Sequence, residues 1–89
     1  MIIASAIKFL IDATNEEVVL CGLRHGDMYK QLAGLGFKPH EGYKELEQGF
    51  ITDKNEFLNR EDAYHHAVEC NQMERKNSDK WTLFSEDLW

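Results

Sequence analysis

Residues 1–11 read MIIASAIKFLI, and this opening stretch indicates a β-strand. One side of its alternating pattern carries Ile3, Ser5, Ile7, Phe9 and Ile11. Alternation over β-branched and aromatic residues is typical of a strand with one buried face. Residues 12–16 (DATNE) have the chemistry of a turn, and residues 17–21 (EVVLC) form a second β-branched run that stops at a glycine. We therefore predict an N-terminal antiparallel hairpin over residues 1–22.

The apolar spacing then changes to a helical period. Met28, Leu32 and Leu35 lie three or four residues apart, which predicts a helix over residues 26–35. Gly36 has the residue type of a C-terminal cap, and Pro39 prevents the helix from continuing. Residues 40–48 are polar, and we predict irregular chain there.

A second hairpin and a second helix follow. Phe50-Ile51 and Phe57-Leu58 flank a turn, which predicts a hairpin over residues 49–58. Asn59 is a good N-cap with acidic residues after it, so a helix over residues 59–72 is expected. Its apolar stripe consists of Ala63, Tyr64, Ala67 and Val68. Residues 74–80 are a charged connector, and residues 81–89 form either an edge strand or an extended tail.

These elements predict a single α+β domain, a small antiparallel sheet packed with two helices. With 89 residues there is no room for a second domain, and the core must be thin. Yet 43% of the residues are apolar, which is more than one small core needs. Burial in a homo-oligomer is therefore expected, and a compact monomer with some exposed aromatic side chains is the alternative.

Charge and cysteine content narrow the possible partners. Sixteen Asp and Glu against ten Lys and Arg give a formal charge of −6, the wrong sign for binding polymeric nucleic acid or an anionic membrane. A small phosphate-bearing ligand needs only one or two well-placed arginines. Two cysteines are too few for the disulfide framework of a small secreted protein, and no signal-peptide pattern is present. A cytoplasmic protein is expected.

Metal and catalytic chemistry are not favoured by the spacing of the reactive residues. Cys21 with His25 and His66 with Cys70 could form a Cys2His2 set, but one pair straddles a strand end and neither has a zinc motif's spacing. Buried thiols and surface imidazoles are the simpler interpretation. No nucleophile elbow or phosphate loop occurs. We predict no catalytic residue, no metal and no cofactor.

Arg24 and His25 form the most suggestive pair, because they follow a strand and precede a helix. An arginine there can bind phosphate beside free helix N–H groups, although a surface ion pair with Asp27 or Glu17 explains it equally. Arg60 lies in the first turn of the second helix, where a cation is unfavourable unless an anion is near. Phe50 is either a core residue or a platform for a base.

The order of several short motifs resembles that of small phage proteins that sequester nucleotide immune signals. The motifs are Ala6-Ile7-Lys8, Arg24-His25, Gly49-Phe50-Ile51-Thr52, Phe57-Leu58-Asn59-Arg60-Glu61-Asp62-Ala63, Asn71-Gln72 and Leu83-Phe84-Ser85-Glu86-Asp87-Leu88-Trp89. The resemblance is to the first Thoeris anti-defence family and to the related anti-CBASS sponges. This chain is shorter than those proteins, and the difference falls in residues 39–48.

The resemblance implies a fold, a function and a set of contacts. The fold would be an antiparallel sheet with two helices that mediate a dimer or a dimer-based hexamer. The function would be non-catalytic capture, in the host bacterial cytoplasm, of a cyclic ADP-ribose isomer, a cyclic oligonucleotide or both. The ligand-binding residues implied by position are Arg24, His25, Phe50, Asn59, Arg60, Ser85, Glu86 and Asp87. The alternative is a protein-interaction module that inhibits a host enzyme through the acidic tail and exposed aromatic residues.

Overall fold

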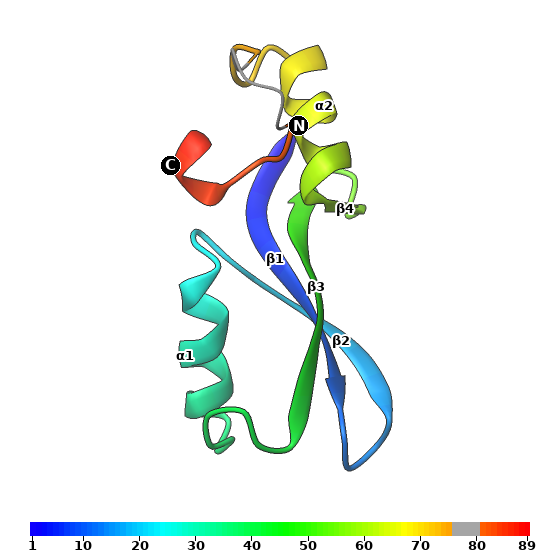
Figure 1. The fold of residues 1–89 in the computed structure, drawn as a ribbon, viewed down its shortest axis with the longest axis vertical. Coiled ribbons are helices and arrows are strands. Elements are labelled where there is room, and N and C mark those ends of the chain that lie inside the picture. Colours follow the sequence, from blue (N-terminus) through cyan, green and yellow to red (C-terminus); the bar gives the residue numbers. More distant parts are fainter. Residues whose placement is uncertain (76–80) are drawn as a thin grey trace.

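The computed structural model describes residues 1–75 and 81–89. Within them, a four-stranded sheet has the order β2-β1-β3-β4, and every neighbouring pair is antiparallel (Figure 1). The strands are β1 (Ile2–Ile11), β2 (Glu16–Gly22), β3 (Tyr43–Thr52) and β4 (Phe57–Asn59). Two α-helices, α1 (Gly26–Gly34) and α2 (Arg60–Glu69), accompany the sheet. The predicted α+β architecture is confirmed.

The N-terminal hairpin forms as predicted, but the face of one residue was predicted wrongly. β1 and β2 pair from Ser5 opposite Gly22 to Ile11 opposite Glu16. Ile3 was expected on the buried side, yet its side chain is 56% exposed, whereas Ile2 is 2% exposed. The register of β1 against β3 shifts between Ile2 and Ala4. A one-residue shift moves side chains to the opposite face, so Ile2 takes the core position.

The prediction of irregular chain over residues 40–48 was wrong, because β3 begins at Tyr43. β3 pairs with β1 from Ile11 opposite Tyr43 to Ile2 opposite Thr52. Its residues 44–47 (KELE) are exposed, so their polar character reflects a solvated surface and not the absence of a strand. The predicted hairpin over residues 49–58 is the end of a longer β3–β4 hairpin.

The helix α1 ends in the Schellman motif that its sequence predicted. Leu35 is the C-cap, and Gly36 follows with a φ of 98°, a left-handed conformation that suits glycine. The Phe37 N–H donates to the Leu32 carbonyl and the Gly36 N–H to the Ala33 carbonyl, both at 3.1 Å. The motif turns the chain sharply, so Phe37 returns beside the helix.

The helix α2 begins where predicted but ends earlier, at Glu69 and not near residue 72. The reason is a second left-handed cap. Asn71 has a φ of 57°, and the Gln72 N–H donates to the Ala67 carbonyl at 2.8 Å. Of the predicted apolar stripe, the fully buried members are Ala63, Tyr64 and Ala67.

The molecule is elongated, 41 × 21 × 21 Å, and holds two apolar clusters at opposite ends of the sheet. The lower cluster lies between α1 and the sheet and contains Ile7, Phe9, Met28, Leu32 and Tyr43. The upper cluster lies against α2 and contains Ile2, Phe50, Ala63, Tyr64, Ala67 and Leu83. In Figure 1, α1 lies along the lower half of the sheet and α2 at its upper end.

Residues 81–89 form an extended tail and not an edge strand. The tail ends in a short 3₁₀ turn, η1 (Ser85–Asp87), and its Leu83 is fully buried in the upper cluster. The turn lies on the same side of the sheet as α1, close to the loop that leads into that helix (Figure 1). Of the predicted connector, residues 76–80 lie outside the described residues. No helix in the described part of the chain is long and apolar enough to cross a membrane.

Candidate ligand site

Arg60 fixes the C-terminal tail to the start of α2. Its guanidinium donates to the Leu83 carbonyl at 2.7 Å and to the side-chain oxygen of Gln48, and it lies 4.9 Å from the centroid of the Phe84 ring. The Leu83 N–H donates back to the Arg60 carbonyl at 2.9 Å. Burial lowers the pKa of Arg60, and the nearby Glu86 opposes that shift. Among the described residues, its hydrogen-bond partners are neutral oxygens.

Arg24 holds the far end of the same tail. Its guanidinium donates to the main-chain oxygen of Trp89, while its own N–H donates to the Asp27 carboxylate at 3.1 Å. Arg24 lies in the loop between β2 and α1, and Arg60 lies 36 positions later in the sequence. We call Arg24, Arg60 and the tail residues 83–89 the arginine clasp.

His25 lies beneath the clasp at the N-cap position of α1. Its side chain is buried, its Nε2 is 2.9 Å from the Gly49 carbonyl, and its ring meets the Phe50 ring edge to face at 5.1 Å. A carbonyl only accepts, so Nε2 carries a proton. Burial lowers the pKa of His25, the Gly49 carbonyl opposes the shift, and the charge of Arg60 adds to it. His25 is therefore neutral near pH 7.

The predicted tail residues occupy the clasp themselves. Ser85 is 5% exposed, and the Asp87 carboxylate accepts from the Phe84 N–H at 2.9 Å. Glu86 is exposed, and its charge opposes the lowering of the pKa that burial causes at His25 and Arg60. The structure thus brings Arg24, His25, Arg60 and the tail together, as expected for one site. In this state, however, the tail supplies the acceptors that the arginines hold.

Two other predicted contact residues, Phe50 and Asn59, have structural roles in the fold. Phe50 is fully buried in the upper cluster, so its ring has no surface on which a base can stack. Asn59 lies next to Arg60 in sequence, but its side chain accepts the Asp62 N–H at 2.8 Å and caps α2. Phenylalanine is a common core residue and asparagine a common N-cap, so their residue types are as consistent with these structural roles as with ligand contact.

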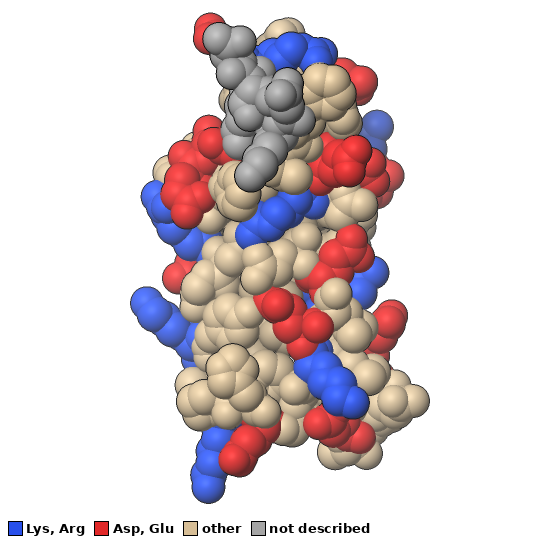
Figure 2. All heavy atoms as spheres, viewed as in Figure 1, with Lys and Arg blue, Asp and Glu red and all other residues tan. Residues whose placement is uncertain are grey.

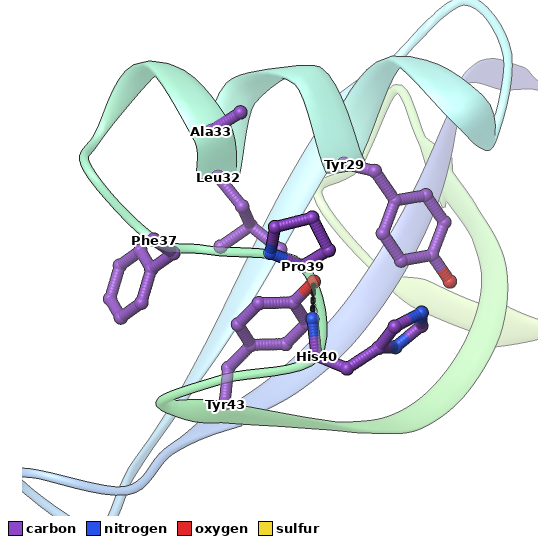
Figure 3. A pocket seen from close by; sticks show the side chains of 7 residues that line it. All are labelled: Tyr29, Leu32, Ala33, Phe37, Pro39, His40 and Tyr43. Carbon is purple, nitrogen blue, oxygen red and sulfur yellow. Dashed lines mark hydrogen bonds between the residues drawn. The ribbon is translucent and has the colours of Figure 1, made fainter.

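An aromatic pocket that the sequence did not predict lies at the other end of α1. It has a volume of about 340 Å³ and is shown in Figure 3. The residues that line it are Tyr29, Leu32, Ala33, Phe37, Pro39, His40 and Tyr43. A visible signal was the concentration of three aromatic residues and one proline within 15 positions, between residues 29 and 43. It was missed because residues 40–48 were read as irregular chain.

A chain of hydrogen bonds along β3 connects the aromatic pocket with the clasp. The Tyr29 hydroxyl donates to the Glu45 carboxylate, which also accepts from the Gln48 amide at 2.8 Å. The Gln48 oxygen in turn accepts from Arg60. Burial and the Glu45 carboxylate raise the pKa of Tyr29 to about 12, so its hydroxyl stays protonated.

The two Cys–His pairs that were considered for zinc do not meet. The expectation of buried thiols and surface imidazoles was wrong, because Cys21 and Cys70 are exposed and His25 is buried. His66 Nε2 and Cys70 Sγ are 3.6 Å apart on α2, whereas His25 is engaged with Gly49 at the start of α1. Among the described residues, no three His, Cys, Asp or Glu side chains converge on a possible metal position. Figure 2 shows acidic and basic side chains interspersed, with no continuous basic area among the described residues of that face.

A family model described as "Phage T4 y16D protein" matches residues 1–89, and the chain therefore belongs to this phage protein family. No curated protein and no solved structure matches the chain. The family description states no activity, so the function must be argued from the residues of the two sites.

Proposed function

We propose that this phage-family protein captures a small nucleotide signal of the infected host and holds it unchanged. The ligand would be a cyclic ADP-ribose isomer or a cyclic oligonucleotide, bound at the arginine clasp. The observation that carries the proposal is the convergence of Arg24, His25 and Arg60 with the tail. These residues come from three segments that are far apart in the sequence.

The chemistry of the clasp favours a phosphate over its present partners. Arg60 is a partly buried cation whose hydrogen bonds go to Leu83 and Gln48, both neutral acceptors. The guanidinium already makes charge-assisted hydrogen bonds to these oxygens, and a phosphate adds an opposite charge and a bidentate geometry. A phosphate that displaces the Leu83 carbonyl would bring this opposite charge to Arg60. Displacement of the tail also removes Glu86 from the vicinity of Arg60.

The groups at the clasp are suited to binding and not to bond cleavage. A guanidinium does not give up its proton near neutral pH, and the Nε2 proton of His25 is directed at the Gly49 carbonyl. The resemblance in motif order points the same way, because it implies reversible capture. The proposal includes assembly into at least a dimer. Leu23 and Leu35, at the two ends of α1, are 55% and 70% exposed and would be buried in such an assembly.

Calorimetric titration with cyclic dinucleotides, cyclic trinucleotides and cyclic ADP-ribose isomers tests the proposal. We expect one class to bind and to be recovered intact after heat denaturation of the complex. Arg24→Ala should weaken binding more than about tenfold, or about 1.4 kcal/mol, without a comparable loss of melting temperature. Arg75→Ala is the matched control, because Arg75 is an exposed residue that follows α2, and no hydrogen bond or ion pair joins it to the clasp among the described residues. Absence of binding across the panel, cleavage of the ligand, or an equal effect of Arg75→Ala would refute it.

Light scattering during gel filtration tests the assembly separately. A mass of two chains or more supports it, and a mass of 10.4 kDa, that of one chain, contradicts it.

A second candidate function, docking onto a host protein, is favoured by the exposure of two aromatic side chains on the tail. Trp81 is 46% exposed and Phe84 is 45% exposed. Aromatic residues are enriched at the centres of protein interfaces. A stoichiometric host protein retained by the wild type but not by the Trp81→Ser, Phe84→Ser double variant would support docking. Retention of nucleotide by both forms would favour capture.

A further inference from the structure

We infer that the aromatic pocket beside α1 is a second binding site, separate from the clasp, that takes an uncharged planar heteroaromatic ring of nucleobase size. The inference does not depend on the proposed function, because it rests on different residues. The walls come from three elements: α1, the loop that follows it, and the first residue of β3 (Figure 3).

The loop beside the pocket contains three residues in the left-handed backbone conformation. Gly36, His40 and Gly42 all have left-handed φ values, of 98°, 58° and 82°. Glycine adopts this conformation freely, but a residue with a side chain does so only when its surroundings enforce it. Strained residues of this kind cluster at ligand sites. His40 is the strained residue here, and its side chain lines the pocket.

The aromatic walls are held in place from behind. Phe9, in the core, meets the Tyr29 ring at 6.0 Å and the Tyr43 ring at 5.5 Å, both edge to face. Phe37 meets Tyr43 edge to face at 5.9 Å. Rings fixed before binding lose little freedom when a ligand arrives, which favours affinity. A planar ring also gains from stacking on aromatic faces, whereas an aliphatic group gains only from burial.

The polar groups of the pocket match a heterocycle and not an anion. None of the seven lining residues is Lys, Arg, Asp or Glu. The Tyr43 hydroxyl accepts from the His40 N–H at 3.2 Å, and the described residues show no acceptor for its own proton. That proton can be donated to a ring nitrogen. The His40 imidazole points to the same side of the pocket as the Tyr29 ring and offers a second polar contact (Figure 3).

The size of the pocket limits the ligand. A volume of about 340 Å³ lies at the low end of small-molecule sites, which span about 300–1,000 Å³. It admits one base with part of its sugar, and it does not admit a cyclic oligonucleotide as a whole. An uncharged nucleoside is therefore the right probe. Its lack of phosphate keeps it independent of the arginines.

The test is a titration of ¹⁵N-labelled protein with adenosine, followed by amide chemical shifts. We expect saturable shifts confined to residues 29–43. Ribose and cyclohexylmethanol are the matched small probes, the first without a base and the second without a planar ring. Neither should produce saturable shifts in the range where adenosine does. Equal binding of either probe would overturn the assignment to a planar heterocycle.

Two variants and two controls complete the experiment. His40→Gly removes the imidazole and relieves the left-handed backbone, so it should keep the melting temperature and weaken adenosine binding at least about fivefold. Phe37→Ala should weaken it to a similar extent. Phe84→Ala, at an aromatic residue of the tail, and Arg24→Ala, in the clasp, should leave it within about twofold. No saturable shift, shifts that map outside residues 29–43, or unchanged binding in His40→Gly would overturn the inference.

Discussion

Gly49→Ala is expected to be one of the most damaging small substitutions in this chain, because β3 and β4 approach each other most closely there. A Cβ at residue 49 would lie 2.1 Å from the Leu58 carbonyl oxygen and 2.7 Å from the Phe57 ring. Carbon and oxygen need more than about 3 Å, so the two strands must separate by about 1 Å. The Leu58 oxygen belongs to the backbone and cannot rotate away.

The expected loss of stability follows from this overlap. Overpacking of a well-packed region costs about 1–3 kcal/mol, and the upper end applies where backbone has to move. For a domain of this size, 1 kcal/mol corresponds to about 4–8 °C. A loss of about 3 kcal/mol would therefore lower the melting temperature by about 12–24 °C. The Gly49 carbonyl also holds His25, so displacement of β3 would loosen the ring beneath the clasp.

Thermal unfolding by circular dichroism, repeated with urea, measures the effect. The matched control is Gly34→Ala, because a Cβ at residue 34 meets nothing within 4 Å. Gly34 is the last residue of α1, so alanine there should stabilise the protein by up to about 1 kcal/mol. If Gly49→Ala changes the free energy of unfolding by less than about 0.5 kcal/mol, then β4 is not pinned against β3 and the reasoning fails.

Three further predictions concern single residues. Asn59→Ala should lower the free energy of unfolding by about 1 kcal/mol, because the cap of α2 is lost, and should change nucleotide affinity by less than about twofold. A large loss of affinity in a variant that stays stable would instead make Asn59 a ligand contact. Burial lowers the pKa of His25 in the folded state below the ordinary value of 6.5, so the unfolded chain binds the proton more readily. The contribution of His25 to stability is therefore complete above about pH 6.5 and declines as the pH falls through the folded-state pKa. The wild type should therefore lose more melting temperature than His25→Gln between about pH 7 and pH 5, and parallel curves would contradict this. Burial also raises the pKa of Cys21, so iodoacetamide should modify this thiol more slowly in the folded than in the urea-unfolded chain, as mass spectrometry of the peptide would show.

The fold was predictable where local chemistry and tertiary packing agree. The hairpin over residues 1–22, the Gly36 cap and the Asn59 cap were all read from residue type, because each depends on a short-range interaction. The start of β3 was not predictable in this way. Residues 44–47 carry no apolar alternation, and they form a strand because β1 lies beside them and offers its backbone groups. When pairing with an adjacent strand determines the conformation of a segment, the sequence of that segment need not show a strand pattern.

The candidate clasp was predictable as a set of residues but not as an arrangement. Arg24 was chosen because it lies between a strand and a helix N-terminus, where it could bind phosphate, and Arg60 because a cation in the first turn of a helix is unfavourable unless an anion is near. In the structure both arginines donate to main-chain oxygens of the tail. The type of Phe50 did not reveal which way its ring points. The alternation that indicates a strand allows a phenylalanine on either face of the sheet, and in the structure Phe50 is buried in the upper cluster.

The C-terminal tail is held against the domain by an apolar anchor and by two arginines. Leu83 is buried in the upper cluster, and Arg60 and Arg24 hold the residues on either side of η1. The apolar anchor and the polar contacts differ in strength. Truncating Leu83 to alanine would cost about 2–5 kcal/mol, whereas each hydrogen bond from a charged arginine contributes about 1.5–3 kcal/mol. Leu88 and Trp89 also pack against the upper cluster, so releasing residues 84–89 would cost apolar burial as well as the arginine contacts. The end of the tail is therefore held by apolar packing and by the two arginines together, so a variant that removes one arginine tests only part of what fixes it.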